Sequence, residues 1–319
     1  MKLELNTSSD GAQQGLLDRL CDAVEAYAKG GVAPEGVELR LIYSGRNRLY
    51  QIGYAGRSYV LKCFAPTSRL QSLACRLGLR RSKAERSHLY SLALESRGIG
   101  VAQSLGYLHR RHTDGTEHSY HLSLDLSASV PHLQAHARGW AAPEGFMPAL
   151  AAYLVAVHEA GVEHLDLSPG NILYSYQRVG AYHFAMVDLN RMKLHQRPLT
   201  RAEAIKNMAR LMNTRSTTQS LAYHYALVRG WDTEETVAEL VRVTDEFWSA
   251  RHLKLSYRYA RRRYAMGLSS FVWMYLRYRL SLLMGQRAEA ARLYRLYLQR
   301  EDIRHIERRR RGFGYQYQD

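Results

Sequence analysis

The sequence predicts an α+β fold with two lobes, a small antiparallel sheet followed by a mainly helical lobe. Residues 37–64 alternate between apolar and polar side chains as strands do, residues 81–98 have helical spacing, and helical patterns dominate from about Thr200 onward. A chain of 319 residues is long enough to bury two cores. The predicted lobes are 1–130, the N-lobe, and 131–319, the C-lobe.

The N-lobe is expected to contain two helices and five strands. Residues 15–31 carry apolar side chains at helical spacing and end in two glycines. The segment 37–64 has turn signals at "SGRN" and "YAGRS", which divide it into three antiparallel strands that end near Lys62. Residues 81–98 form the second helix. Residues 101–126 supply two more strands around the polar stretch "HTDGTE".

The C-lobe begins where the periodicity is lost, between Ser127 and Glu144. A helix is expected at 147–161, followed by the turn "HLDLSPGNIL" and a hairpin over 171–192. Beyond it the chain is rich in Arg and Tyr at helical spacing. A sheet lobe joined to a helical lobe leaves a cleft at the joint, so a ligand is expected there.

The charge balance predicts an anionic partner. The chain has 45 Lys plus Arg against 29 Asp plus Glu, a formal charge of +16, which suits nucleic acid, a membrane surface or a phosphorylated substrate. Its three cysteines include no CxxC pair, which argues against a disulfide framework and a structural zinc site. The N-terminus lacks the apolar core of a signal peptide, and no stretch reaches the roughly 20 apolar residues that span a bilayer. A cytoplasmic protein is expected.

The turn "HLDLSPGNIL" places Asp166 and Asn171 five positions apart, in a segment that Pro169 and Gly170 prevent from continuing as a helix. One interpretation is a surface turn, because these residue types favour turns. The other is a phosphoryl-transfer loop, in which Asp166 orients a hydroxyl and Asn171 holds a metal ion. The motif alone does not choose between them.

Other residues could supply the remaining parts of a phosphoryl-transfer site. Lys62 ends the apolar strand "SYVLKCF", as a phosphate-pairing lysine would, and Glu85 on the next helix could pair with it. Asp188 follows an apolar strand in "FAMVDLNRM", a natural position for a magnesium ligand. Taken singly, each has a plainer explanation: an exposed lysine, an exposed helical acid and a turn-capping aspartate. His164 is expected to hold the loop by hydrogen bonds.

The order of these parts is more specific than any one of them. A strand-end Lys, a helical Glu, H-x-D-x-x-x-x-N and a strand ending in Asp follow one another as in protein kinases. Five segments carry a more specific resemblance: "IYSGRN", "VLKCF", "SKAERS", "HLDLSPGNIL" and "VDLNRMKL". Through them the chain resembles the Kdo/WaaP lipopolysaccharide kinase family over residues 38–215. The resemblance implies a two-lobed protein-kinase-like fold, ATP and Mg²⁺ as cofactors, and an inner-core sugar of lipopolysaccharide as acceptor, Kdo first and heptose second.

The resemblance also implies the site residues. The catalytic set is Asp166, Lys62 and Glu85, and the metal ligands are Asn171 and Asp188. The nucleotide turn "SGRNRLY" has one glycine instead of G-x-G-x-x-G, so phosphate contacts are expected from Lys62 and from the residues Gly45, Arg46 and Asn47.

Two departures from protein kinases narrow the substrate. Ser168 stands where protein kinases usually have a lysine, two residues after the catalytic aspartate. After Asp188 there is no DFG or APE motif and little room for an activation segment before the helix predicted at "RAEAIKNMARL". These departures favour a small-molecule or glycolipid kinase over a regulated protein kinase.

The basic segments leave the partner open between several classes. The stretch 65–86 places Leu70, Leu73 and Leu77 on one helical face among arginines, which suits an anionic membrane surface or packing on the sheet. "RYARRRY" and "ERRRRGFGYQYQ" either lie near lipid phosphates or are solvated faces. "LYRLYLQR" is compatible with nucleic-acid binding, although Tyr294 and Tyr297 suit a packed helix equally and no nucleic-acid-binding signature is present.

The preferred interpretation is an ATP-dependent kinase with a glycolipid substrate and contact with the inner face of the inner membrane. A basic nucleic-acid- or membrane-binding module on a kinase-like scaffold, a protein kinase, and a scaffold that has lost catalysis are the alternatives. Nucleic acid is not an expected partner.

Overall fold

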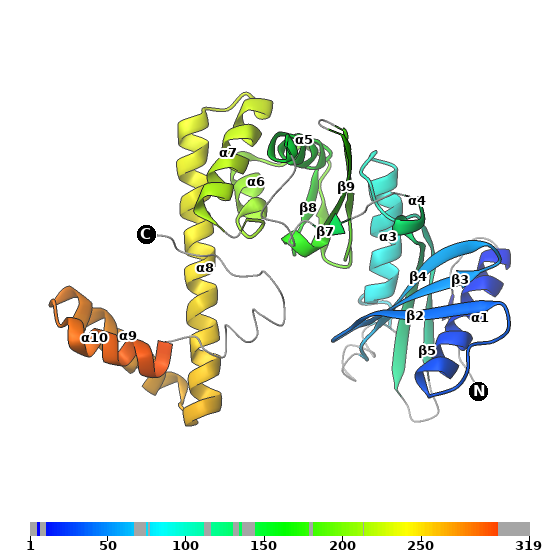
Figure 1. Cartoon of the computed structure of the whole chain (residues 1–319), viewed down its shortest axis with the longest axis horizontal. Coiled ribbons are helices and arrows are strands. Elements are labelled where there is room, and N and C mark those ends of the chain that lie inside the picture. The colour runs from blue at the N-terminus through cyan, green and yellow to red at the C-terminus, as the bar shows by residue number, and fades with distance from the viewer. Residues whose placement is uncertain are drawn as a thin grey trace. The chain divides into compact units, whose positions relative to one another are not determined.

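The computed structural model describes residues 5–6, 11–66, 75, 77–111, 116–129, 134–135, 144–178, 181–212 and 214–298. These residues form two compact units: the first contains the described residues up to 200, and the second those from 201 to 298 (Figure 1). An antiparallel sheet in the N-terminal part and helices in the C-terminal part confirm the expected fold class. The lobe boundary at residue 130 lies inside the first unit and stays a prediction.

The first unit contains a six-stranded sheet in the order β1-β5-β6-β4-β3-β2, with every neighbouring pair antiparallel. Five of these strands are the ones that the alternating patterns predicted. The sixth, β1, is two residues long and pairs with β5; so short a strand has no periodicity to detect. The strands are β1 (Leu5–Asn6), β2 (Val37–Ser44), β3 (Arg48–Tyr54), β4 (Arg57–Phe64), β5 (Ser104–Arg111) and β6 (Glu117–Leu124).

Helices cover both faces of this sheet. Helix α1 (Gly11–Ala28) buries Leu17 and Leu20 against Ile52, Leu61 and Leu122, which lie on one face. Helix α3 (Lys83–Glu95) begins at the side-chain cap Ser82 and contacts the opposite face, where Phe64 and Tyr107 pack with Ala84. Because successive side chains of a strand point to opposite faces, Lys62 points away from α1.

A buried ion network fixes α1 on the sheet. Arg110 of β5 is 3% exposed. Its guanidinium donates to Asp22 at 2.6 Å and Glu25 at 3.2 Å, and lies 3.3 Å from Asp18. A buried cation needs partners of opposite charge, so the three carboxylates of α1 help to determine how the helix sits on the sheet.

The remaining elements of the first unit surround the predicted loop. Helix α5 (Phe146–Glu159) packs on β8 and β10 through a face that includes Leu150 and Leu154. Two small antiparallel sheets have the strand orders β10-β9-β7 and β11-β8. The elements are α4 (Leu126–Ser129), β7 (Gln134–Ala135), β8 (Val162–His164), the 3-10 turn η2 (Pro169–Asn171), β9 (Ile172–Arg178), β10 (Ala181–Met186) and β11 (Met192–Leu194).

The chain between α3 and β5 joins the sheet to the β9–β10 hairpin. The Met186 amide donates to the Gly100 carbonyl at 2.8 Å, and Val101 forms a parallel bridge with Met186. Arg97 donates to the carbonyl of Ala160 at 2.7 Å. A Cβ on Gly100 would lie 2.2 Å from the Phe184 carbonyl oxygen, so only glycine permits this approach.

Replacing Gly100 with alanine is therefore expected to lower both stability and turnover. The obstacle is backbone, so the hairpin must shift; overpacking of this kind costs about 1–3 kcal/mol. A misplacement of about 1 Å near reacting groups lowers turnover on the order of 10- to 100-fold. Urea unfolding and turnover of Gly100→Ala test this, with Gly15→Ala as the control, since nothing lies within 4 Å of that Cβ. Equal behaviour of the two variants would contradict the assignment.

The second unit is helical, as predicted. Helices α7 (Arg215–Arg229) and α8 (Thr233–Tyr264) pack side by side, burying Leu221, Tyr225, Leu240 and Trp248. The other elements are α6 (Arg201–Met208), α9 (Leu268–Leu283), α10 (Arg287–Leu293) and the π-helical turn η3 (Tyr294–Leu298).

A second cluster holds the C-terminal helices of this unit together. Ala260 of α8, Phe271 and Met274 of α9, Leu293 and Leu298 are buried in it. Tyr297 packs against the same cluster, and Tyr294 is 44% exposed. Leu293, Tyr297 and Leu298 of "LYRLYLQR" thus take part in helix packing. Leu296 is 39% exposed. The basic run that contains Arg308 and Arg311 lies outside the described residues.

Candidate functional site

Strand β4 directs Lys62 toward the hairpin that carries Asp188. Lys62 lies opposite Leu49 of β3 and His121 of β6 in the sheet. Its Nζ lies 2.5 Å from Oδ1 of Asp188, although the two residues are 126 positions apart in the sequence. The side chains are 14% and 35% exposed, so the pair is screened from water on the lysine side but still reachable. The structure thus brings together two residues that sequence reasoning selected independently.

Asp188 has a backbone conformation suited to its residue type. It follows β10 with a φ of +59°, the left-handed region that aspartate and asparagine tolerate better than other non-glycine residues. The Asn190 side-chain amide donates to the same Oδ1, at 2.5 Å. Asn190 is 8% exposed and was not among the predicted site residues, although it stands inside the motif "VDLNRM". The signal in the sequence was an amide two residues after a strand-end acid.

His164 holds the predicted loop, as expected. The imidazole is completely buried, and its Nδ1 accepts from the Asp166 amide at 3.1 Å. The ring nitrogen Nε2 lies 3.2 Å from the Val187 carbonyl and must be the donor in that hydrogen bond. Burial lowers the pKa of His164, which keeps the ring neutral with its proton on Nε2. The ring therefore ties the loop to the segment before Asp188.

Asn171 closes the loop in which Asp166 lies. Its side-chain amide donates to the Asp166 carbonyl at 2.8 Å, and its backbone amide donates to Ser168 at 2.9 Å. The Asn171 carbonyl accepts from Val187 at 3.0 Å. The spacing of five is thus the length at which the asparagine side chain reaches back to the aspartate backbone.

The Asp166 carboxylate is accessible and lies close to a cation. It is 27% exposed, and Oδ2 lies 3.5 Å from a guanidinium nitrogen of Arg191. The Leu165 amide donates to the Arg191 carbonyl at 2.9 Å, which fixes the backbone of this arginine next to the loop. Arg191 was also missed from the sequence. Basic residues are too common in this chain for one of them to stand out.

The residues predicted to bind magnesium have a suitable chemistry. Asn171 and Asp188 flank the paired strands β9 and β10, in which Ile172 lies opposite Met186. The amide nitrogen of Asn171 is used by Asp166, which leaves its side-chain oxygen as the ligand atom. One carboxylate and one amide oxygen, completed by substrate phosphates and water, form the kind of site that Mg²⁺ prefers. Among the described residues, no group of three or more His, Cys, Asp or Glu has metal-binding geometry.

Glu85 lies in the first turn of α3 but contacts a different cation from the predicted one. Its carboxylate lies 3.5 Å from Arg81, four residues earlier, and its backbone amide is capped by Ser82. Within the part of the chain that the structure describes, the ion-pair partner of Lys62 is Asp188. The pairing of Glu85 with Lys62 stays a prediction.

A chain of neutral polar groups lies beside Lys62. The hydroxyl of Ser104 is within 2.8 Å of both His88 of α3 and His121 of β6. Burial, and next the positive charge of Lys62, lowers the pKa of His121 to about 3. His121 is therefore uncharged at neutral pH, so it adds no positive charge next to the lysine.

Additional cations gather at the start of α3. Burial lowers the pKa of Lys83, and the charge of Arg46 lowers it further, while Asp188 opposes the shift. Burial and then Arg80 lower the pKa of Arg86, and Arg191 contributes in the same direction. Lys83 is thus within electrostatic range of both the predicted nucleotide turn and Asp188. Lys83 was not among the predicted site residues.

The predicted nucleotide turn is anchored to the end of β4. Asn47 accepts a hydrogen bond from the Ala65 amide at 3.2 Å through Oδ1, and the Gly45 amide donates to the Asn47 carbonyl at 3.1 Å. Gly45 and Arg46 also border a cavity of about 550 Å³ on the α1 side of the sheet, with Lys29 and Arg48. Contact of the turn with nucleotide phosphates stays a prediction.

Of the basic segment 65–86, only the ends are described. Leu70, Leu73, Arg69 and Arg76 fall outside the described residues, whereas Leu77 is 63% exposed.

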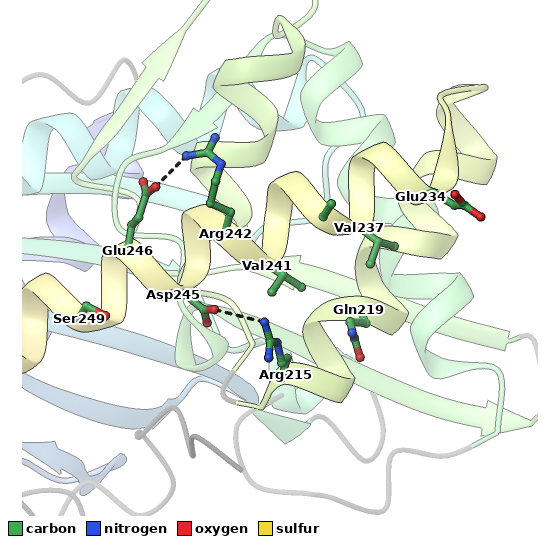
Figure 2. A pocket seen from close by; sticks show the side chains of 10 residues that line it. Arg215, Gln219, Glu234, Val237, Val241, Arg242, Asp245, Glu246 and Ser249 are labelled. Carbon is green, nitrogen blue, oxygen red and sulfur yellow. Dashed lines mark hydrogen bonds and ion pairs between the residues drawn. The ribbon is translucent and has the colours of Figure 1, made fainter. Parts of the chain in front are cut away.

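A separate hollow of about 820 Å³ lies between α7 and α8 of the second unit, and Figure 2 shows the side chains that line it. Its charged residues pair with one another: Arg215 lies 3.8 Å from Asp245, and Arg242 lies 2.7 Å from Glu246. Such mutual pairing is typical of a solvated surface between two helices. None of the predicted site residues lines it.

Comparison with known proteins bears on the same residues. Residues 45–240, more than half of the chain, match the model of the lipopolysaccharide kinase (Kdo/WaaP) family. Among curated proteins, none matches the chain.

The chain is also similar to solved kinase structures. One is WaaP in complex with acyl carrier protein, with 16% identity, 76% of this chain and 99% of that chain covered, and a TM-score of 0.43. Another is an aminoglycoside-3'-phosphotransferase of type VIII, with 17% identity, coverage of 72% and 99%, and a TM-score of 0.43. A MAP kinase of Leishmania major has 17% identity, coverage of 71% and 66%, and a TM-score of 0.31. At such identities the similarity concerns the fold alone.

Proposed function

Because the chain belongs to the lipopolysaccharide kinase (Kdo/WaaP) family and is a kinase, we propose that it phosphorylates an inner-core sugar of lipopolysaccharide, Kdo first and heptose second. The family implies ATP as the phosphoryl donor. The observation that carries the proposal is the contact between Lys62 and Asp188, which joins the sheet to the end of the β9–β10 hairpin beside the Asp166 loop. This is the arrangement that phosphoryl transfer requires: a cation for the phosphates next to a metal-binding carboxylate.

In this proposal each residue has a defined role. Lys62 holds the donor phosphates, and its partner Asp188 keeps the ammonium in place until they bind. Asp166 orients the acceptor hydroxyl and takes its proton, while His164 and Asn171 fix the backbone on either side of that carboxylate. Asn171 and Asp188 would hold Mg²⁺, which when bound neutralises charge on the phosphates. Positioning and charge neutralisation supply most of the rate in such reactions.

The cations near the site support an acceptor that is itself anionic. Arg191 lies 3.5 Å from Asp166. Burial, and next the charges of neighbouring arginines, lower the pKa values of Lys83 and Arg86. Groups of like charge are costly to gather unless an anion is bound among them. An inner-core sugar, with carboxylate or phosphate groups nearby, meets that requirement better than a neutral metabolite.

The proposed location is the cytoplasmic side of the inner membrane, with the chain bound peripherally. In the part of the chain that the structure describes, no helix is long and apolar enough to cross a bilayer. A kinase acting on a lipid-linked sugar must nevertheless work at a membrane surface.

An acceptor panel tests the function. Purified protein, ATP and Mg²⁺ are incubated with Kdo-lipid A, with heptosylated lipid acceptors and with a generic protein substrate, and the products are identified by mass spectrometry. We expect a mass gain of one phosphoryl group on a glycolipid, with Kdo-lipid A modified first. Phosphate found only on the protein substrate would overturn the proposal.

A further inference from the structure

Helix α9 has two apolar faces, of which the protein buries one. Phe271 and Met274 pack into the cluster formed with α8 and the C-terminal elements, and Ser281 lies on the same side. A helix that only filled this core would be polar on its opposite side.

The opposite side of α9 is instead strongly apolar. Trp273 is 73% exposed, Leu276 and Leu280 are each 56% exposed, and Leu283 is 81% exposed. These residues follow one another at intervals of three and four, so they form a single stripe along the helix. Val272 and Met284 are further exposed apolar side chains at the borders of this stripe. Contiguous exposed apolar surface of this kind marks an interaction site.

Arginines border the stripe. At 3.6 residues per turn, Arg277 and Arg279 fall on its two edges, between the apolar and the buried sides. Arg277 is also tied to α10, since its guanidinium lies 2.8 Å from Glu289. The last turn of α8, just before α9, adds the exposed residues Arg261, Arg262 and Arg263. An apolar stripe with a tryptophan and basic edges is the pattern of a helix that lies in a membrane interface.

The length and charge of α9 exclude an orientation in which the helix spans the bilayer. Sixteen residues span about 24 Å as a helix, short of the roughly 30 Å hydrocarbon core, and two arginines lie within the segment. The helix therefore fits the plane of the interface.

We propose that the exposed face of α9, defined by Trp273, Leu276, Leu280 and Leu283, docks this protein on the surface of an anionic bilayer. The occupant is a bilayer because the edges of the stripe are cationic and its centre carries no charge. The biological role of this docking rests on the proposed function, because a kinase reaches a lipid-linked acceptor sugar at such a surface.

Vesicle co-sedimentation of the full chain tests the proposal. The probes are phosphatidylcholine vesicles with and without 30% phosphatidylglycerol. Changing Trp273, Leu276 and Leu280 to serine together is expected to weaken binding at least about tenfold on both vesicles, because apolar burial contributes on both. The matched control changes Tyr223, Leu227 and Val228 to serine; these are exposed apolar residues of α7 in the same unit, and binding should stay within about twofold.

Two single variants separate the contribution of charge to vesicle binding from that of the apolar stripe. Arg279→Gln is expected to weaken binding about fivefold on the anionic vesicles and to change nothing on neutral ones, since one basic residue near such a surface contributes about that much. Trp273→Phe should retain most of the binding but lose the blue shift of tryptophan emission that anionic vesicles induce in the wild type.

Wild-type binding by the α9 triple-serine variant, or an equal loss in the α7 control, would overturn the inference. A second outcome would also overturn it. If light scattering shows that the wild type is a dimer, and the α9 changes make it monomeric without affecting vesicle binding, then the exposed face of α9 binds a second copy of the chain instead of a bilayer. Turnover on a deacylated, water-soluble inner-core acceptor keeps the two proposals separate: we expect the α9 variant to match the wild type there. Absence of turnover in both proteins would count against the proposed function and leave the vesicle result standing.

Discussion

Replacing Asp188 with asparagine is expected to abolish phosphoryl transfer, by at least about 100- to 1,000-fold, while the chain stays folded. A neutral amide cannot neutralise the phosphates with the metal, and Lys62 loses the carboxylate that it contacts at 2.5 Å. Asparagine adopts the left-handed backbone at φ +59° as readily as aspartate, so the loop after β10 should keep its shape. ATP turnover across a magnesium titration and thermal unfolding are the measurements.

The control for this variant is Asp188→Ala, which removes the same charge but strains the backbone as well. Its turnover should match that of the asparagine variant, and its unfolding temperature should be lower, because alanine in the left-handed region costs about 1–2 kcal/mol. Asn171→Ala should weaken magnesium use less than either change; it also removes the hydrogen bond to the Asp166 carbonyl, so some loss at saturating magnesium is expected. Retention of most activity by Asp188→Asn at low magnesium would show that the metal site is wrongly assigned.

Changing Asp166 to asparagine is expected to lower turnover by roughly 100-fold or more, the usual scale for a positioned base. The side chain keeps its size but can no longer accept the acceptor proton. Nucleotide affinity should stay near the wild-type value, because Lys62 and the metal ligands are unchanged. Lys62→Ala should instead mainly disturb the placement of the nucleotide phosphates. Turnover and nucleotide affinity are measured on the same preparations.

The matched control is Glu163→Gln, a loss of the same charge three residues earlier. Glu163 contacts His195 at 3.1 Å and Lys193 at 3.5 Å, so turnover should change by no more than a few-fold. The competing nucleic-acid interpretation predicts the opposite pattern. Under it, Asp166→Asn would be silent, and replacement of Arg308 through Arg311 would weaken polynucleotide binding with a smaller salt dependence. That combination would end the kinase interpretation.

Local patterns in the sequence predicted the long strands and helices of the first unit, but not short strands such as β1 and β7. They also selected the candidate site residues. Alternation over 37–64 predicted β2, β3 and β4, because a half-buried strand shows its two faces in the order of its residues. The loop from His164 to Asn171 was also recognisable, since its hydrogen bonds run between near neighbours. Asp188 was identified by its place after an apolar strand. These features depend on residues close together in the chain.

Tertiary structure decided which of these residues meet. Lys62 faces Asp188 because the Gly100 segment binds the hairpin to the sheet, and that contact depends on the missing side chain of a glycine with no pattern of its own. The contact between Arg191 and Asp166 likewise arises only when β11 pairs with β8 beside the loop. Asn190, by contrast, contacts Asp188 from only two residues away.

Helix α9 shows the same difference between what local sequence predicts and what tertiary packing decides. The sequence predicted that this part of the chain is helical, but it could not say which side of the helix is buried. Packing of Phe271 and Met274 against α8 and the C-terminal elements settled that, and left Trp273 and its neighbours in solvent. The physical reason is that helical periodicity is a local property of the chain, whereas burial depends on which distant surfaces are available to cover a face.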